Sequence, residues 1–165
     1  PTGNLREPRS GAKRADLIVV TKCSKDISEA EKQKITARLK PLSHQQLFFS
    51  YVDYALAVVS GSEELELIKL PKFTLVTGIA NAKPLVDFLA EKGLDFDHLE
   101  YSDHYSFKES DIETLVSKTL IITTEKDYVR LSGYEKLKNK LYYLPIQIQI
   151  DKAAQFNAVV SNYIN

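Results

Sequence analysis

The sequence predicts an α/β fold with a mainly parallel sheet of about five to six strands and helices on both faces. Short apolar runs rich in β-branched residues, such as 17–21 and 119–123, have the length and composition of strands buried on both sides. Segments with helix start and stop signals lie between these runs. Strands that alternate with helices along a chain are typical of βαβ units.

Composition indicates one globular domain over residues 1–165, because no internal stretch rich in Pro, Gly or Ser marks a linker. Lys plus Arg and Asp plus Glu number 22 each, so the chain lacks the basic excess of a nucleic-acid binder. Its apolar runs are too short to span a bilayer, and we expect the chain to be soluble. The single cysteine, Cys23, leaves no internal disulfide and favours a reducing compartment.

Helix signals divide the first third of the chain. Ser28 and Glu31 have the spacing of a capping box, which starts a helix, and Pro41 ends that helix near residue 40. The expected elements here are a loop leading into a short helix at 1–14, a strand at 17–21, the helix, and strands at 46–52 and 56–60.

The remainder of the chain contains similar start and stop signals for helices. Pro84 in a first turn and Gly93 after the last turn bracket a helix. The expected elements are strands at 73–77, 96–102, 119–123 and 141–150, and helices at 84–92, 109–117, from 125, and at 152–163.

In parallel sheets, ligands bind at the carboxyl ends of the strands. Four segments follow predicted strands and are therefore candidate site segments: 21–24, 77–81, 102–107 and 123–127.

Asp103 and His104 adjoin one another after a predicted strand. An imidazole titrates near neutral pH and, with a carboxylate to orient it, can act as a general base. Adjacent residues of an extended segment point in opposite directions, so we expect His104 to pair with a carboxylate from another segment. The alternative is that both residues only cap the helix that starts near Glu109.

The segment Thr124-Glu125-Lys126-Asp127 begins a predicted helix. Thr124 is a good N-cap, and the two acids suit the helix dipole, so helix initiation alone can explain these residues. Lys126 is unfavourable there unless a phosphate or carboxylate lies nearby or solvent screens it.

Other candidates are weaker by themselves. Gly78 follows a strand at a turn where backbone N–H groups can face a ligand. Arg6, Glu7 and Arg9 occupy a Pro-restricted loop, which suits either phosphate contacts or plain solvation. The chain contains neither GxGxxG nor GxxxxGK[ST], which argues against independent nucleotide binding through the usual loops, and its histidines lack metal-site spacing.

In this order the motifs resemble the tetraacyldisaccharide 4'-kinase family over essentially the whole chain. The segments that carry the resemblance are Gly3-Asn4-Leu5-Arg6-Glu7-Pro8, Ile18-Val19-Val20-Thr21-Lys22-Cys23, Thr77-Gly78-Ile79-Ala80, Asp103-His104-Tyr105-Ser106-Phe107, Thr124-Glu125-Lys126-Asp127 and Tyr142-Tyr143-Leu144-Pro145.

The resemblance implies a fold related to P-loop kinases and Rossmann-like, and transfer of the ATP γ-phosphate, with Mg²⁺, to the 4'-hydroxyl of a lipid A disaccharide precursor. It places the full protein at the cytoplasmic side of the bacterial inner membrane. An N-terminal half with the membrane-associating segment and the P-loop is expected ahead of Pro1. The chain would then be the C-terminal half of a longer kinase, and inactive alone.

The resemblance also implies roles for single residues. His104 would belong to a catalytic dyad whose carboxylate lies in the N-terminal half, with Asp103 in support. Arg6, Glu7 and Arg9 would face the phosphate and metal region, with Glu7 a candidate metal ligand. Thr21, Lys22 and Gly78 are candidates for nucleotide contacts.

Two other interpretations of the same residues stay open. The chain could be a stand-alone Rossmann-like module that binds a small phosphorylated ligand. It could also be an interaction domain whose strand-end motifs are only helix caps.

Overall fold

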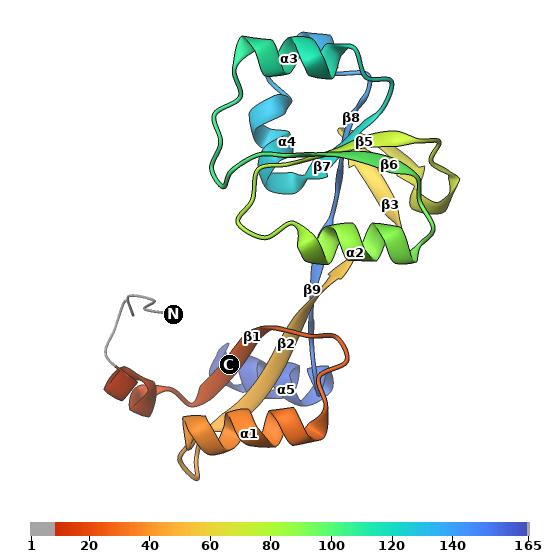
Figure 1. The fold of residues 1–165 in the computed structure, drawn as a ribbon. Coiled ribbons are helices and arrows are strands. Elements are labelled where there is room, and N and C mark those ends of the chain that lie inside the picture. Colours follow the sequence, from red (N-terminus) through yellow and green to blue (C-terminus); the bar gives the residue numbers. More distant parts are fainter. Residues whose placement is uncertain (1–8, 165) are drawn as a thin grey trace. The chain divides into compact units, whose positions relative to one another are not determined.

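The computed structural model describes residues 9–164, which divide into two compact units (Figure 1). Unit 1 comprises the residues up to Asp53 and those from Gln147, and unit 2 is the continuous segment Tyr54–Ile146. This differs from the single domain expected from the sequence. No linker signal marks the boundary because the chain passes between the units inside two strands, β2 (Gln46–Tyr54) and β9 (Ile146–Ile150).

Unit 1 is built on a three-stranded sheet in the order β1-β2-β9, with β1 and β2 parallel. Its elements are η1 (Arg9–Arg14), β1 (Leu17–Cys23), α1 (Glu29–Leu39), β2, β9 and α5 (Ala153–Ile164). Helix α1 starts at the predicted capping box, where Ser28 Oγ accepts from the Glu31 N–H at 3.2 Å.

The two helices of unit 1 cover opposite faces of its sheet. Phe48 of β2 packs edge-on against Phe156 of α5, with ring centroids 5.2 Å apart. The next residue, Phe49, lies under the Lys32 ammonium of α1 at 5.6 Å. Neighbouring residues of a strand point to opposite faces, so α5 and α1 lie on different sides.

Unit 2 is built on a six-stranded sheet in the order β4-β3-β8-β7-β5-β6. Strands β8, β7, β5 and β6 are parallel, whereas β3 and β4 form an antiparallel hairpin beside β8. The elements are β3 (Ala57–Ser60), β4 (Glu63–Glu66), η2 (Leu67–Lys69), β5 (Phe73–Thr77), α2 (Lys83–Glu91), β6 (Phe96–Glu100), α3 (Glu109–Val116), β7 (Ile121–Thr124), α4 (Glu125–Leu131), η3 (Glu135–Leu137) and β8 (Leu141–Leu144).

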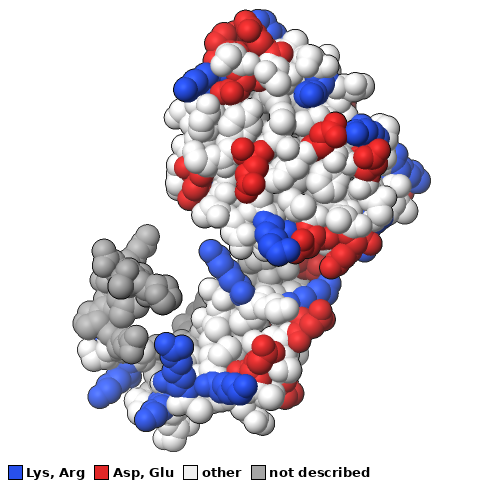
Figure 2. All heavy atoms as spheres, viewed as in Figure 1, with Lys and Arg blue, Asp and Glu red and all other residues white. Residues whose placement is uncertain are grey.

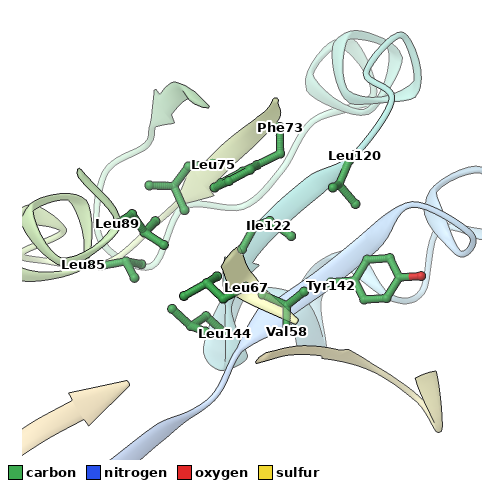
Figure 3. Packing of buried hydrophobic residues seen from close by; sticks show 10 residues of the cluster. All are labelled: Val58, Leu67, Phe73, Leu75, Leu85, Leu89, Leu120, Ile122, Tyr142 and Leu144. Atoms are coloured by element: carbon green, nitrogen blue, oxygen red, sulfur yellow. The ribbon is translucent and has the colours of Figure 1, made fainter. Parts of the chain in front are cut away.

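Each face of the unit 2 sheet carries its own apolar core, and Figure 1 shows α2 on one side and α3 and α4 on the other. Leu75 and Ile122 point towards Leu85 and Leu89 of α2, in the cluster drawn in Figure 3. Their strand neighbours Val76 and Ile121 belong to the opposite cluster, which also contains residues of α3 and α4. The α/β class with a mainly parallel sheet and helices on both faces is therefore confirmed.

One strand prediction was wrong, and one strand was missed. The strand expected over 141–150 is divided at Pro145, and its parts β8 and β9 belong to different sheets. Proline lacks the N–H that a ladder needs, so the chain can change sheets there. Strand β4 was not expected at all, because Glu63–Glu66 is an exposed, acidic edge strand without an apolar pattern.

Candidate functional site

Three of the four predicted strand-end segments meet in unit 2, after β5, β6 and β7. These strands are parallel neighbours, so their carboxyl ends lie at the same edge of the sheet. The backbone of Gly78, after β5, contacts both of the other segments. Its N–H donates to Asp127 at 2.8 Å, and its carbonyl accepts from the His104 N–H at 3.3 Å.

Asp127 is the buried centre of this arrangement, with no exposed surface. Its Oδ2 accepts from the Gly78 N–H and from the Thr124 hydroxyl, each at 2.8 Å. Its Oδ1 accepts from Arg130 Nη1 at 3.1 Å. A buried carboxylate is stable only when its oxygens are bonded and its charge is paired, and these three donors meet both conditions.

Thr124 is the N-cap of α4, as predicted, and its Oγ1 accepts from the Asp127 N–H at 3.1 Å. Gly78 packs closely beside this cap, because an added Cβ would lie 3.1 Å from Asp127 Oδ1 and 3.6 Å from the Ser102 carbonyl oxygen. The turn after β5 therefore approaches α4 closely enough for its backbone N–H to donate a hydrogen bond to Asp127.

His104 has a backbone conformation that is unusual for a residue with a side chain, with φ at 59°. The left-handed region costs an L-residue about 1–2 kcal/mol, and such strain collects at functional sites. An aromatic cluster lies beside this turn: the rings of Tyr101 and Tyr105 are 4.8 Å apart, and those of Tyr101 and Phe107 are 5.1 Å apart. This packing stabilises the loop that presents the imidazole.

The imidazole of His104 is 71% exposed and has three charged neighbours. Arg130 Nη2 lies 3.3 Å from Nδ1, and Lys126 Nζ lies 3.4 Å from Nε2. Asp103 Oδ2 lies 3.7 Å from the same Nε2. Among the described residues the imidazole therefore meets two cations and its own neighbour. The carboxylate expected from another segment stays a prediction.

Lys126 has the negative partner that its place at a helix start requires. Its ammonium donates to Asp103 Oδ1 at 3.0 Å. This hydrogen bond, together with the nearby His104 and the ammonium charge, lowers the pKa of Asp103 below its ordinary value. A carboxylate partner was one of the outcomes expected from the sequence.

The alternative in which Asp103 and His104 cap the next helix is wrong. Helix α3 has Lys108 as its N-cap, and the Lys108 N–H donates to Asp111 at 2.8 Å. The Tyr105 hydroxyl donates to the same carboxylate at 3.1 Å. The N-cap of α3 is thus neither of the two candidate residues.

The other predicted site residues lie elsewhere. Thr21 and Lys22, at the end of β1 in unit 1, line an open hollow of about 470 Å³, and Lys22 has a φ of 58°. Arg6 and Glu7 lie outside the described residues, and Arg9 begins η1. Glu125 is exposed on the first turn of α4.

Sequence reasoning missed Arg130, which joins Asp127 to His104. The available signal was its spacing: Arg130 stands three residues after Asp127, and residues at that interval are neighbours on a helix. Its contact with His104 comes from tertiary structure and has no local signature.

Charged groups of both signs are interspersed over unit 2 on the face shown in Figure 2. Within residues 9–164, no group of three or more His, Cys, Asp or Glu side chains is arranged to hold a metal ion. Over the same residues, every helix is too short or too polar to be a candidate membrane span.

Comparison with known proteins places these motifs in a family. The sequence model described as Tetraacyldisaccharide-1-P 4'-kinase matches residues 1–165. The chain is 42% identical to the tetraacyldisaccharide 4'-kinase of Flavobacterium johnsoniae and 41% identical to that of Flavobacterium psychrophilum, covering 99% of this chain and 49% of each relative. The relative from Phocaeicola vulgatus is 33% identical, over 99% of this chain and 50% of its own length.

The crystal structure of LpxK from Aquifex aeolicus in complex with ATP has the same fold, with a TM-score of 0.63 at 20% identity. The match covers 98% of this chain and 47% of that one. The chain thus spans about half the length of the relatives that it matches. With the family match running from the first residue to the last and the motif residues 78, 103, 104 and 127 brought together in unit 2, the chain belongs to the tetraacyldisaccharide 4'-kinase family.

Proposed function

We propose that this chain is the C-terminal half of an ATP-dependent kinase that phosphorylates the 4'-hydroxyl of the tetraacyldisaccharide 1-phosphate precursor of lipid A. The names of its relatives support the phosphoryl acceptor. The ATP complex of the Aquifex aeolicus relative supports the phosphoryl donor. The single observation that carries the site assignment is the exposed imidazole of His104, held at a strand end on a strained backbone.

His104 is suited to accept or orient the proton of the attacking hydroxyl. Phosphoryl transfer is catalysed mainly by positioning and by stabilisation of charge, with a base that orients the nucleophile. The neighbouring cations Lys126 and Arg130 add positive charge where phosphoryl oxygens would arrive. Asp103 would act through Lys126 and the imidazole rather than as the base itself.

ATP and Mg²⁺ are the expected co-substrate and cofactor, and we propose that an N-terminal half of the kinase binds them through a P-loop. The two aspartates of the site in unit 2 are engaged otherwise: Asp127 by three donors and Asp103 by Lys126. Glu7 and the two arginines of the first loop would contribute to the phosphate and metal region from the segment beside that half. The 165-residue chain alone would then lack kinase activity.

The same proposal places the complete kinase at the cytoplasmic face of the inner membrane, with membrane contact through its N-terminal half and no nucleic-acid partner. The lipid acceptor would present its sugar hydroxyl to the β5-β6-β7 edge of unit 2. Thr21, Lys22 and Gly78 remain our candidates for contacts to the nucleotide.

Replacement of His104 in the complete kinase tests this function. His104→Ala should lower kcat by about 10²- to 10⁴-fold, the usual contribution of general base catalysis. His104→Gly should lower kcat equally while raising the free energy of unfolding by up to about 1 kcal/mol, because glycine relieves the left-handed strain. The measurements are steady-state kinetics and urea denaturation.

His44→Ala is the matched control, since His44 is an exposed histidine of unit 1. It should leave both kcat and stability unchanged. A His104→Ala kinase that turned over at the normal rate would remove the catalytic assignment.

A further inference from the structure

The hydrogen-bonding groups around the imidazole of His104 include more donors than acceptors. Arg130 Nη2 lies 3.3 Å from Nδ1, and Lys126 Nζ lies 3.4 Å from Nε2. Guanidinium and ammonium groups offer only donors, and a neutral imidazole has a single ring lone pair to accept them. At least one of the two cations therefore faces a ring N–H instead of an acceptor, and both would do so if the ring were protonated.

The nearby carboxylates do not remove this shortage. Asp103 Oδ1 accepts from Lys126 at 3.0 Å, whereas its Oδ2 lies 3.7 Å from Nε2 of the ring, beyond hydrogen-bond distance. Asp127 Oδ1 accepts from Arg130 at 3.1 Å, and its Oδ2 already accepts from two donors. The donors that surround the imidazole thus outnumber the acceptor atoms that residues 9–164 place within reach of them.

The two cations are also held in place while remaining accessible to solvent. Each is fixed by its own aspartate, and the aspartate that holds Arg130 is fully buried. The side chains of Lys126 and Arg130 are 42% and 28% exposed. Donors that are fixed beforehand lose little side-chain entropy when a ligand binds. Water can accept from such donors, but an anion forms charge-assisted hydrogen bonds that are about twice as strong.

We propose that Lys126, Arg130 and the imidazole of His104 form an oxyanion site in which the ligand's oxygens accept hydrogen bonds from the two cations and the ring. The cations lie beside different ring nitrogens, so one ligand must offer several acceptor atoms to serve them together. A terminal phosphoryl group offers three strong acceptor oxygens and a charge of nearly −2, which suits this arrangement.

The role of the oxyanion site in the reaction rests on the proposed kinase function. His104 is assigned to the attacking 4'-hydroxyl, so the phosphoryl group beside it is the one that is transferred. The phosphate already carried by the acceptor is attached at the other end of the disaccharide. In the transfer step the 4'-oxygen forms a bond to the terminal phosphorus of ATP, the bond to the ADP oxygen breaks with its electron pair, and the hydroxyl proton passes to His104.

Inorganic phosphate tests the oxyanion site in the 165-residue chain by NMR, at fixed pH and at an ionic strength held constant with chloride. The ring signals of His104 are assigned by their loss in His104→Ala. We expect these signals to shift with phosphate concentration and to saturate, whereas chloride alone should produce no saturating shift. An absent or unsaturable response to phosphate would overturn the inference.

Substitution of each cation identifies the ligands. Lys126→Gln removes a charge but keeps a donor for Asp103, and Arg130→Lys keeps a charge beside Asp127 but loses the forked guanidinium. Each change should weaken phosphate binding by about 10-fold or more, the usual weight of a hydrogen bond to a charged group. Lys69→Gln is the matched control, because Lys69 forms an exposed ion pair elsewhere in unit 2, and it should leave the affinity unchanged. Unchanged affinity in Lys126→Gln and Arg130→Lys would refute the site.

Kinetics of the complete kinase test which phosphate the site holds. Lys126→Gln should lower kcat by about 10²- to 10³-fold, the usual cost of losing one donor to transition-state charge, with KM for the lipid acceptor unchanged. A raised KM for the acceptor at normal kcat would overturn the assignment to the transferred group and indicate the acceptor's own phosphate. Phosphate binding by the 165-residue chain requires no kinase activity, so its failure would refute the oxyanion site alone. Normal activity of the His104→Ala kinase would instead refute the proposed function.

Discussion

Lys126 shows how the position of a single residue in the sequence can indicate a contact. A cation in the first turn of a helix opposes the helix dipole, so the sequence indicated a negative partner without identifying it. The partner is Asp103, which lies 23 residues earlier in the chain. The helix-dipole rule predicted that Lys126 has a negative partner. Only the parallel sheet, however, brings the two strand ends together. Arg130 had no such local anomaly, which is why the sequence left it unnoticed.

The pKa of Asp103 should depend on Lys126. The Lys126 hydrogen bond is the largest cause that lowers this pKa, so Lys126→Met should raise it towards its ordinary value of 3.8. A carboxyl whose folded pKa is depressed adds stability above its unfolded pKa and loses it as pH falls through the folded value. In Lys126→Met, the loss of stability that Asp103 causes as the pH falls should therefore be smaller. Carbon-13 NMR titration of the Asp103 carboxyl measures the shift.

Lys83→Met provides the control for that titration, because Lys83 forms a comparable ion pair with Asp87 on α2. It should leave the Asp103 titration where it was. If Lys126→Met also left it unmoved, the Lys126–Asp103 hydrogen bond would not be the cause.

At the level of elements, α4 and the turn after β5 are held together by the close contact between Asp127 and Gly78. The helix starts were predictable because a cap is encoded within four residues, as at Ser28 and Thr124. The approach of Gly78 to Asp127 spans 49 residues and leaves only a lone glycine in the sequence. A lone glycine has many explanations. The role of Gly78 became clear only from the short distance between an added Cβ and Asp127 Oδ1.

Gly78→Ala should therefore destabilise the chain by about 1–3 kcal/mol, the usual cost of overpacking a fixed interior. The new methyl group would meet Asp127 Oδ1 at 3.1 Å, and that carboxylate is held by three donors. Gly133→Ala is the comparison, because its Cβ would meet nothing within 4 Å. That change should alter the free energy of unfolding by no more than about 0.5 kcal/mol. Equal effects of the two changes in urea denaturation would contradict the close contact.

For the whole molecule, the sequence predicted the kind of sheet but not its division into two. Apolar runs such as 73–77 and 121–124 fix buried parallel strands, because such patterns reflect burial on both faces. Nothing in a strand pattern tells which sheet the strand joins. That choice depends on long-range pairing, and at Pro145 the chain leaves one sheet for the other.

Unit 2 should fold without unit 1. Both of its core clusters consist of residues within 54–146, and its ends are joined by a 3.0 Å hydrogen bond from the Ala55 N–H to the Pro145 carbonyl oxygen. Close termini and a complete core are the properties of an independently folding segment. The segment 54–146 should show cooperative thermal unfolding by circular dichroism. Leu75→Ala in that segment should cost about 2–5 kcal/mol and serves as the check that its core has formed. A gradual, non-cooperative melt of the segment would contradict this prediction.

The discontinuity of unit 1 has a consequence for how the chain is made. Strand β2 is translated long before its sheet neighbour β9, so residues 9–53 emerge from the ribosome with their pairing partner still unsynthesised. Unit 2 is contiguous and can be complete while translation continues. Unit 2, which carries His104, would then finish folding before unit 1, although unit 1 contains the earlier residues of this chain.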